Sequence, residues 1–229
     1  MSKTSLNLIA ILVFAMTLSV LLGPWLQISP YVPAIATAIV LGFTTLDTFS
    51  WQGQGGNLII DLLASTSPEH RARIVRHEAG HFLVATLLGI PISGYSLSAW
   101  EALQQGHPGQ GGVRFADREL VSQLQKGILS SQVFHRYGTI WMAGIAAEVL
   151  VYGNAEGGGE DREKLGITLA QLGNSGLNYA QQERYFILQA RTLLQSHWAT
   201  YETLVAAMEK REPVAVCQQI IQEDQSSSG

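Results

Sequence analysis

The chain has 229 residues, a formal net charge of −4 at pH 7 and 47% hydrophobic residues. This length accommodates one compact domain with a small appendage. The negative charge and the lack of a Lys/Arg run argue against a nucleic-acid-binding protein. The single cysteine, Cys217, excludes an internal disulfide and a thiolate zinc cluster, so that a bound metal would need histidine and carboxylate ligands.

The N-terminal segment differs in composition from the rest of the chain. No charged residue occurs between Thr4 and Leu46. A break at 23–30 divides this segment into two apolar runs of about 18 and about 16 residues, each slightly shorter than the roughly 20 that a membrane-spanning helix prefers. A signal peptide would have a small-residue cleavage site after one short apolar core, whereas here a second long apolar run follows. We therefore predict a two-helix transmembrane hairpin over residues 1–46, with a cleaved signal peptide as the alternative.

The orientation of this hairpin follows from its few flanking charges. Lys3 precedes the first run, and the break contains no Lys or Arg. By the positive-inside tendency, both ends of the hairpin are expected on the cytoplasmic side of an integral membrane protein. Residues 47–66 are then predicted to form a linker.

The remainder of the chain, 67–222, is predicted to be mainly helical with a small β-sheet. Ser67-Pro68-Glu69 begins a helix, because it combines a capping hydroxyl, proline at the first position and an acid in the first turn. This helix is expected to end near Leu88, before Gly89-Ile90-Pro91. Two strands, separated by a polar Gln/Gly-rich loop, are expected at 92–99 and 111–115. Further helices are predicted at 117–128, 132–152, 161–172, 177–208 and 212–222, and the tail 223–229 is expected to be disordered because it has nothing to bury.

An HExxH pattern, His77-Glu78-Ala79-Gly80-His81, lies within the first of these helices. His77 and His81 are about 40° apart around a helix, and Glu78 falls on the adjacent flank. Two imidazoles can therefore hold one zinc ion, while the carboxylate of Glu78 reaches a water molecule bound to it and acts as the catalytic base. The alternative is a surface helix with incidental histidines.

A catalytic zinc site needs a third protein ligand and an open position for water. The other histidines are interpreted as ordinary surface or core residues. Glu148 is the only charged residue in a tightly packed small-residue segment, and it needs either a buried arginine or a zinc-bound histidine as partner. Glu160 and Asp161 follow a glycine-rich loop and begin the next helix. Spacing alone does not separate these three carboxylates.

Residues 68–221 resemble the zinc-peptidase domain of the FtsH family of membrane-bound AAA proteases. The matching motifs are Arg-His-Glu-Ala-Gly-His at 76–81, Ala-Gly-Ile-Ala-Ala-Glu-Val-Leu-Val-Tyr-Gly at 143–153, and the glycine-rich loop that ends in Asp161. The resemblance implies a zincin-like fold in which Asp161 is the third zinc ligand. It also implies that Glu148 lies near the metal, where it supports a ligand without being one.

FtsH proteins carry an ATPase module between the membrane segment and the peptidase domain, whereas this chain has only a short linker there and no GxxxxGK[ST] pattern. The chain is therefore similar to the ATPase-less relatives of cyanobacteria and plastids. The resemblance implies a membrane-anchored zinc endopeptidase that hydrolyses membrane or unfolded proteins on the cytoplasmic or stromal side of a plasma or thylakoid membrane. The expected partners are a protein or peptide substrate, the membrane, and a second copy of this chain or an ATPase acting in trans. FtsH relatives are hexameric, but much of that assembly depends on the ATPase module.

Two other functions remain open at this stage. One is a non-proteolytic membrane scaffold or assembly factor that keeps the peptidase fold, although a structural zinc site has no need of Glu78. The other is an intramembrane protease, which is disfavoured because Arg71, Arg73 and Arg76 directly precede the HExxH pattern.

Overall fold

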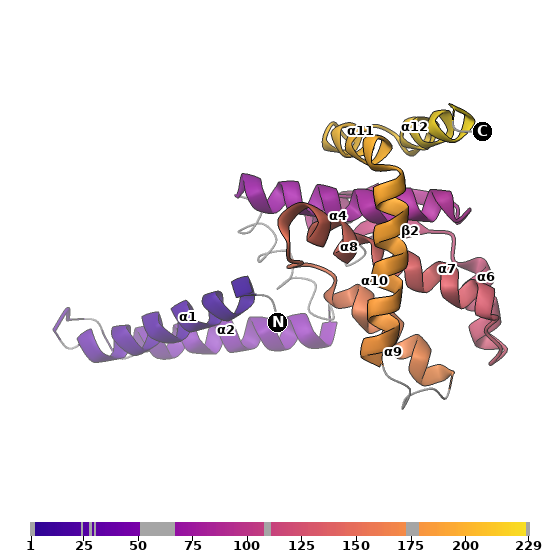
Figure 1. Ribbon diagram of the computed structural model, residues 1–229. Coiled ribbons are helices and arrows are strands. Elements are labelled where there is room, and N and C mark those ends of the chain that lie inside the picture. The colour runs from indigo at the N-terminus through magenta and orange to yellow at the C-terminus, as the bar shows by residue number, and fades with distance from the viewer. Residues whose placement is uncertain are drawn as a thin grey trace. The chain divides into compact units, whose positions relative to one another are not determined.

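The computed structural model describes residues 3–23, 25–27, 29, 31–50, 67–107, 111–172 and 179–227. These residues are mainly helical, with one two-stranded sheet (Figure 1). They divide into two compact units. One unit contains helices α1, α2 and α5, and the other contains the sheet and the remaining helices.

The two predicted N-terminal segments form helices, α1 (Lys3–Leu22) and α2 (Tyr31–Ser50), which lie side by side. Several of their apolar side chains are more than half exposed, including Phe14 and Ile39. No helix in the described part of the chain is both long enough and apolar enough to cross a membrane. The transmembrane part of the prediction therefore has no support from these helices.

Two details of the predicted organisation are wrong in this unit. The linker does not begin at residue 47, because α2 continues to Ser50; residues 51–66 lie outside the described residues. The region expected to be a polar loop contains a short helix, α5 (Ala99–Gln104). The Ser98 hydroxyl caps this helix by accepting a hydrogen bond from the Glu101 amide.

Helix α4 (Pro68–Leu87) forms as predicted and lies at the centre of the second unit. It packs most extensively against α8 (Ala143–Tyr152). The contact depends on Gly80, because a Cβ atom there would lie 2.7 Å from the carbonyl oxygen of Ala143. A glycine in the HExxH pattern thus lets the helix that carries the two histidines approach α8 closely.

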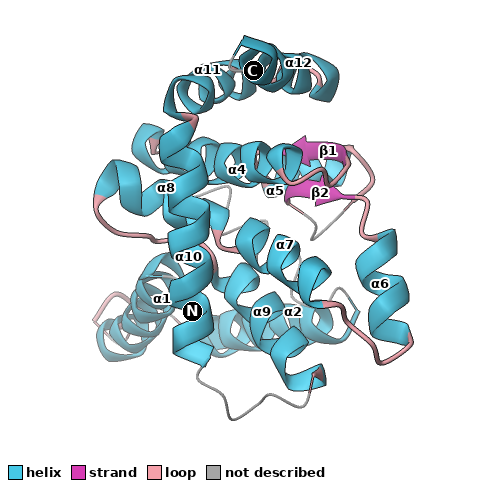
Figure 2. Cartoon of the chain, turned by 45° about the vertical axis from the view of Figure 1, so that its right-hand side comes forward, coloured by secondary structure: helices cyan, strands magenta, loops and turns pink. Residues whose placement is uncertain are grey.

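The two predicted strands form an antiparallel pair, β1 (Ile92–Ser96) and β2 (Gly112–Phe115). Tyr95 pairs with Val113, and the register is irregular between Ile92 and Gly94. Both strands lie beside α4 (Figure 2). Strand β1 ends three residues earlier than predicted.

The remaining helices match the prediction in position but are more divided. The predicted helix 132–152 is broken at Met142, and the predicted helix 177–208 is broken at His197. The helices after β2 are α6 (Arg118–Gln125), α7 (Ser131–Trp141), α8, α9 (Gly159–Gln171), α10 (Tyr179–Ser196), α11 (Trp198–Glu209) and α12 (Val214–Ser227).

Helix α12 contradicts the prediction of a disordered tail at 223–229, because it continues through Ser227. Polar side chains near the C-terminus make hydrogen bonds that could not be predicted from their composition. Asp224 Oδ2 accepts a hydrogen bond from His197 Nδ1 at 2.8 Å, and Gln219 Nε2 donates to Glu223 Oε1 at 2.8 Å.

One apolar core holds the second unit together. It is built mainly from α4, α7, α8, α10 and α11, and its fully buried side chains include Phe82, Ile140, Phe186, Tyr201 and Leu204. This core surrounds the buried half of α4. Burying a polar side chain there costs free energy unless it has a hydrogen-bond partner, an ion-pair partner or a metal ion.

Candidate metal centre

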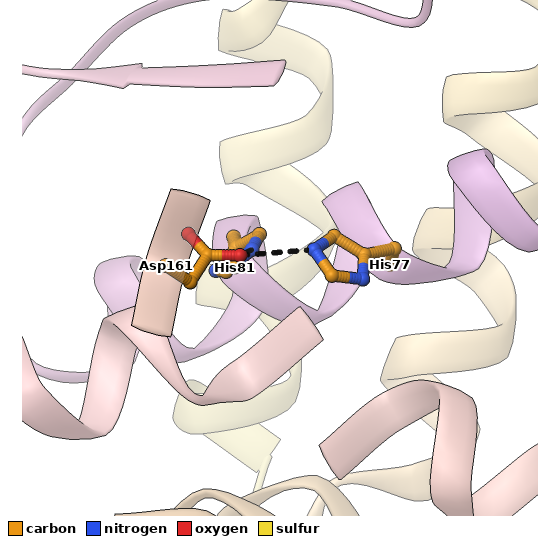
Figure 3. A group of neighbouring side chains, drawn as sticks. All are labelled: His77, His81 and Asp161. Atoms are coloured by element: carbon orange, nitrogen blue, oxygen red, sulfur yellow. Dashed lines mark hydrogen bonds and ion pairs between the residues drawn. The ribbon is translucent and has the colours of Figure 1, made fainter. Parts of the chain in front are cut away.

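Three side chains predicted as metal ligands lie close together between α4 and α9. His77 and His81 come from adjacent turns of α4, and Asp161 comes from the first turn of α9 (Figure 3). One potential ligand atom from each lies within 4.8 Å of the other two, and all three residues are less than 10% exposed. No other group of three such residues occurs in the described part of the chain. The arrangement can hold a metal ion.

The orientation of both imidazole rings favours this interpretation. His81 Nδ1 lies 2.7 Å from the carbonyl oxygen of Ile140, which can only accept, so Nδ1 carries the proton. His77 Nδ1 lies 2.7 Å from Glu148 Oε1. Each ring therefore presents its other nitrogen, Nε2, to Asp161 Oδ2, at 3.2 Å from His77 and 3.4 Å from His81. Fixing Nδ1 with an acceptor is the usual way in which proteins orient a ligating histidine.

The convergence of these three atoms requires positive charge between them. Neutral imidazole nitrogens and a carboxylate oxygen are all acceptors, and they repel unless a proton or a metal ion joins them. Without a metal, burial lowers the pKa of His77, but hydrogen bonds to Asp161 and Glu148 outweigh it and raise the pKa to about 10. Burial raises the pKa of Asp161, but the two histidines outweigh it and lower the pKa well below the usual range. The group can therefore be joined either by a proton on His77 or by a metal ion.

Glu148 supports this group from outside it. Its carboxylate is buried and accepts four hydrogen bonds: from His77 Nδ1 and the Gly157 amide on Oε1, and from Arg73 Nη1 and the Glu156 amide on Oε2. Burial raises its pKa, but these partners, His77 first, lower it to about 2, so Glu148 is ionised at neutral pH. The two partners considered for Glu148 from sequence, an arginine and a histidine, are both present.

The glycine-rich loop brings Asp161 to the histidines because it can lie directly against them. A Cβ atom on Gly157 would be 2.7 Å from Glu148 Oε1 and 3.1 Å from His77 Nδ1. A Cβ atom on Gly144 of α8 would also overlap the His77 ring. Gly158 adopts a left-handed backbone conformation, with φ of 83°, immediately before α9. Glu160, in the same turn as Asp161, is exposed and does not join the group.

Arg73 is a contributor that the sequence interpretation missed. Its guanidinium contacts Glu148, donates to Asn154 Oδ1 at 3.0 Å and lies 4.2 Å from the centre of the Tyr152 ring. Arg73 thereby connects α4 to the segment that follows α8. Its position could have indicated this role, because Arg73 is four residues before His77 and the two therefore lie on one face of the helix.

Glu78, the predicted catalytic base, is not one of the three converging residues. It lies between the histidines in sequence, on the flank of α4 that faces the sheet, and is partly exposed. Its Oε2 accepts a hydrogen bond from the Val113 amide of β2 at 2.9 Å. One carboxylate oxygen is thus held by the sheet.

No protein-family model and no curated protein sequence matches this chain. The resemblance to the FtsH peptidase domain therefore stays a prediction from three motifs.

The Glu148→Gln variant is expected to weaken metal binding about 10–100-fold, as is usual when a residue that orients a metal ligand is lost. Glutamine has nearly the same shape but replaces one acceptor oxygen with an NH₂ group, so two of the four donors lose their partner. Competition with a chromophoric chelator measures the dissociation constant. The control is Glu156→Gln. The Glu156 side chain is half exposed, and its contact with Arg73 is long, at 3.9 Å. Equal affinity of the Glu148 variant and the wild type would show that Glu148 does not support the site.

Proposed function

We propose that the protein is a zinc-dependent endopeptidase that hydrolyses peptide bonds of membrane or unfolded proteins. The observation that carries the proposal is the pair of histidines in the HExxH pattern, whose Nε2 atoms both face Asp161 while their Nδ1 atoms are held by acceptors. Glu78 supplies an acid between them that the metal group does not use.

The donor set suits zinc in a catalytic role. Two histidines and one carboxylate leave a fourth tetrahedral position for water, whereas a structural zinc site uses four protein ligands. Two histidines and a carboxylate also hold non-haem iron(II) in some oxygenases. The adjacent Glu78 favours hydrolysis, because an oxygenase site has no use for a general base at that position.

His77, His81 and Asp161 would hold the ion, and zinc would supply Lewis-acid activation of water and of the scissile carbonyl. Glu78 has a separate task. With Oε2 engaged by the Val113 amide, Oε1 is the atom available to take a proton from the attacking water and to deliver it to the leaving amine. Glu148 holds His77 Nδ1 and so fixes the direction of Nε2.

Membrane attachment and partners are part of the same proposal and are based on sequence. The charge-free segment from Thr4 to Leu46 would anchor the protein, with the peptidase unit on the cytoplasmic or stromal side. Because these 229 residues contain no GxxxxGK[ST] pattern, the peptidase unit would act on substrates that are already unfolded, or with an ATPase in trans. Self-association is the further possibility that the FtsH resemblance suggests.

Cleavage of a permanently unfolded protein by the full chain in detergent or nanodiscs tests this function. We expect fragments to appear with the zinc-loaded protein, to disappear with a chelator and to return when zinc is added. A protein that binds one zinc ion per chain but cleaves neither unfolded nor membrane substrates would support the scaffold function instead.

A further inference from the structure

The contact between Glu78 and strand β2 joins residues from two parts of the chain. The Val113 amide donates to Glu78 Oε2 at 2.9 Å, across 35 positions of sequence. Val113 is the second residue of β2 and pairs with Tyr95 of β1. The sheet is small, but its pairing with β1 and its contacts with α4 give this amide a fixed direction.

Gly112, the residue before Val113, leaves room for the same carboxylate. A Cβ atom on Gly112 would lie 2.7 Å from Glu78 Oε2 and 3.1 Å from Glu78 Cδ. These distances are too short, so the carboxylate, which is the end of a flexible side chain, would have to move. Gly112 also has a φ of 89°, which strains any other residue. The positive φ accounts for a glycine at position 112. It does not account for the Glu78 carboxylate lying where the Cβ atom of another residue would be.

We propose that β2 positions Glu78 through Gly112 and Val113. The Val113 amide holds one carboxylate oxygen, and the missing side chain at Gly112 keeps the space in which that carboxylate lies. Oε1 is thereby directed for proton transfer. The role of this arrangement in catalysis rests on the proposed function, whereas the contact between the Val113 amide and Glu78 does not. Gly112 and Val113 are positioning residues, because they act through Glu78.

Replacing Gly112 with alanine in the full chain tests the role in catalysis. Because small misplacements of a reacting group can cost about a hundredfold, we expect Gly112→Ala to lower kcat at least about tenfold. KM and zinc content are expected to stay within about twofold of wild type, as for loss of an interaction made only in the transition state.

Two matched variants separate positioning from backbone strain. Gly127 also has a positive φ, of 66°, but no atom lies within 4 Å of a Cβ placed there. Gly111→Ala adds a methyl group beside Gly112, where likewise nothing lies within 4 Å. Both variants are expected to keep the wild-type kcat. Equal loss of kcat in the Gly112 and Gly127 variants, or no loss in the Gly112 variant, would overturn the proposal.

Amide hydrogen exchange at Val113 tests the contact without any activity measurement. Glu78→Ala removes the acceptor and is expected to speed exchange at Val113 at least about tenfold, whereas Glu78→Gln keeps an acceptor oxygen and is expected to keep the protection. Gly112→Ala should behave like Glu78→Ala. Unchanged exchange in the Glu78→Ala variant would overturn the positioning role even in an active peptidase. Faster exchange in a protein that cleaves no substrate would support the contact and count against the proposed function instead.

Discussion

The Glu78→Gln variant is expected to bind one zinc ion per chain as tightly as the wild type and to hydrolyse peptide bonds about 10²–10⁴-fold more slowly. Glutamine keeps the length of the side chain and an oxygen that can accept from the Val113 amide. It cannot take a proton from water at neutral pH. Since Glu78 is outside the group of converging metal ligands, the loss should appear in catalysis alone.

Initial rates on an unfolded substrate, together with the zinc content of the same preparation, measure both parts of this prediction. Glu163→Gln is a suitable control, because Glu163 is an exposed acid on α9. A Glu78 variant that cleaves as fast as the wild type would remove the general-base role, whatever its zinc content.

The Asp161→Ala variant is expected to weaken zinc binding more than about a hundredfold, beyond the usual effect of a residue that only supports a ligand. Asp161 supplies the only carboxylate that faces both Nε2 atoms within the described residues. The methyl group of alanine leaves two neutral imidazoles, which hold zinc poorly. Zinc titration followed by calorimetry measures the change in affinity.

Thermal unfolding provides a second readout for Asp161. A ligand present at about a thousand times its dissociation constant stabilises the folded state by about 4 kcal/mol, so zinc should raise the Tm of the wild type. The same zinc concentration should stabilise Asp161→Ala by about 1.4 kcal/mol or less, so its Tm should rise by no more than roughly a third as much. The matched control is Glu160→Ala, because Glu160 is the neighbouring acid that is exposed. If Glu160→Ala lost zinc and Asp161→Ala kept it, the assignment of the third ligand would be reversed.

Local sequence signals predicted most of the secondary structure. Ser67-Pro68 and Gly89 bound α4 because capping and chain-reversing residues act within one turn. The break at Met142 was missed because apolar residues continue through it. The break at His197 was missed because no glycine or proline lies near it. Helix α5 was missed because the surrounding Gln/Gly-rich composition hid the Ser98 cap.

Spacing alone predicted the candidate site only where its residues are close in sequence, and the choice of Asp161 and Glu148 came from the resemblance to the FtsH family. His77, Glu78 and His81 follow from helical spacing, but spacing left Glu148, Glu160 and Asp161 equivalent. The structure separates them by tertiary contacts: Glu148 is bonded to His77 Nδ1, and Asp161 faces Nε2. These contacts span 71 and 84 positions of sequence, and no local pattern encodes them.

X-ray absorption spectroscopy of the zinc-loaded full chain measures which atoms coordinate the zinc ion. We expect two imidazole nitrogens at about 2.0–2.1 Å, one carboxylate oxygen and one water at similar distances, and no sulfur. The same spectrum should be lost in the His81→Ala variant, which is expected to bind zinc too weakly to be loaded under the same conditions. A sulfur ligand at about 2.3 Å, or a fourth protein ligand in place of water, would contradict a catalytic zinc site at His77, His81 and Asp161.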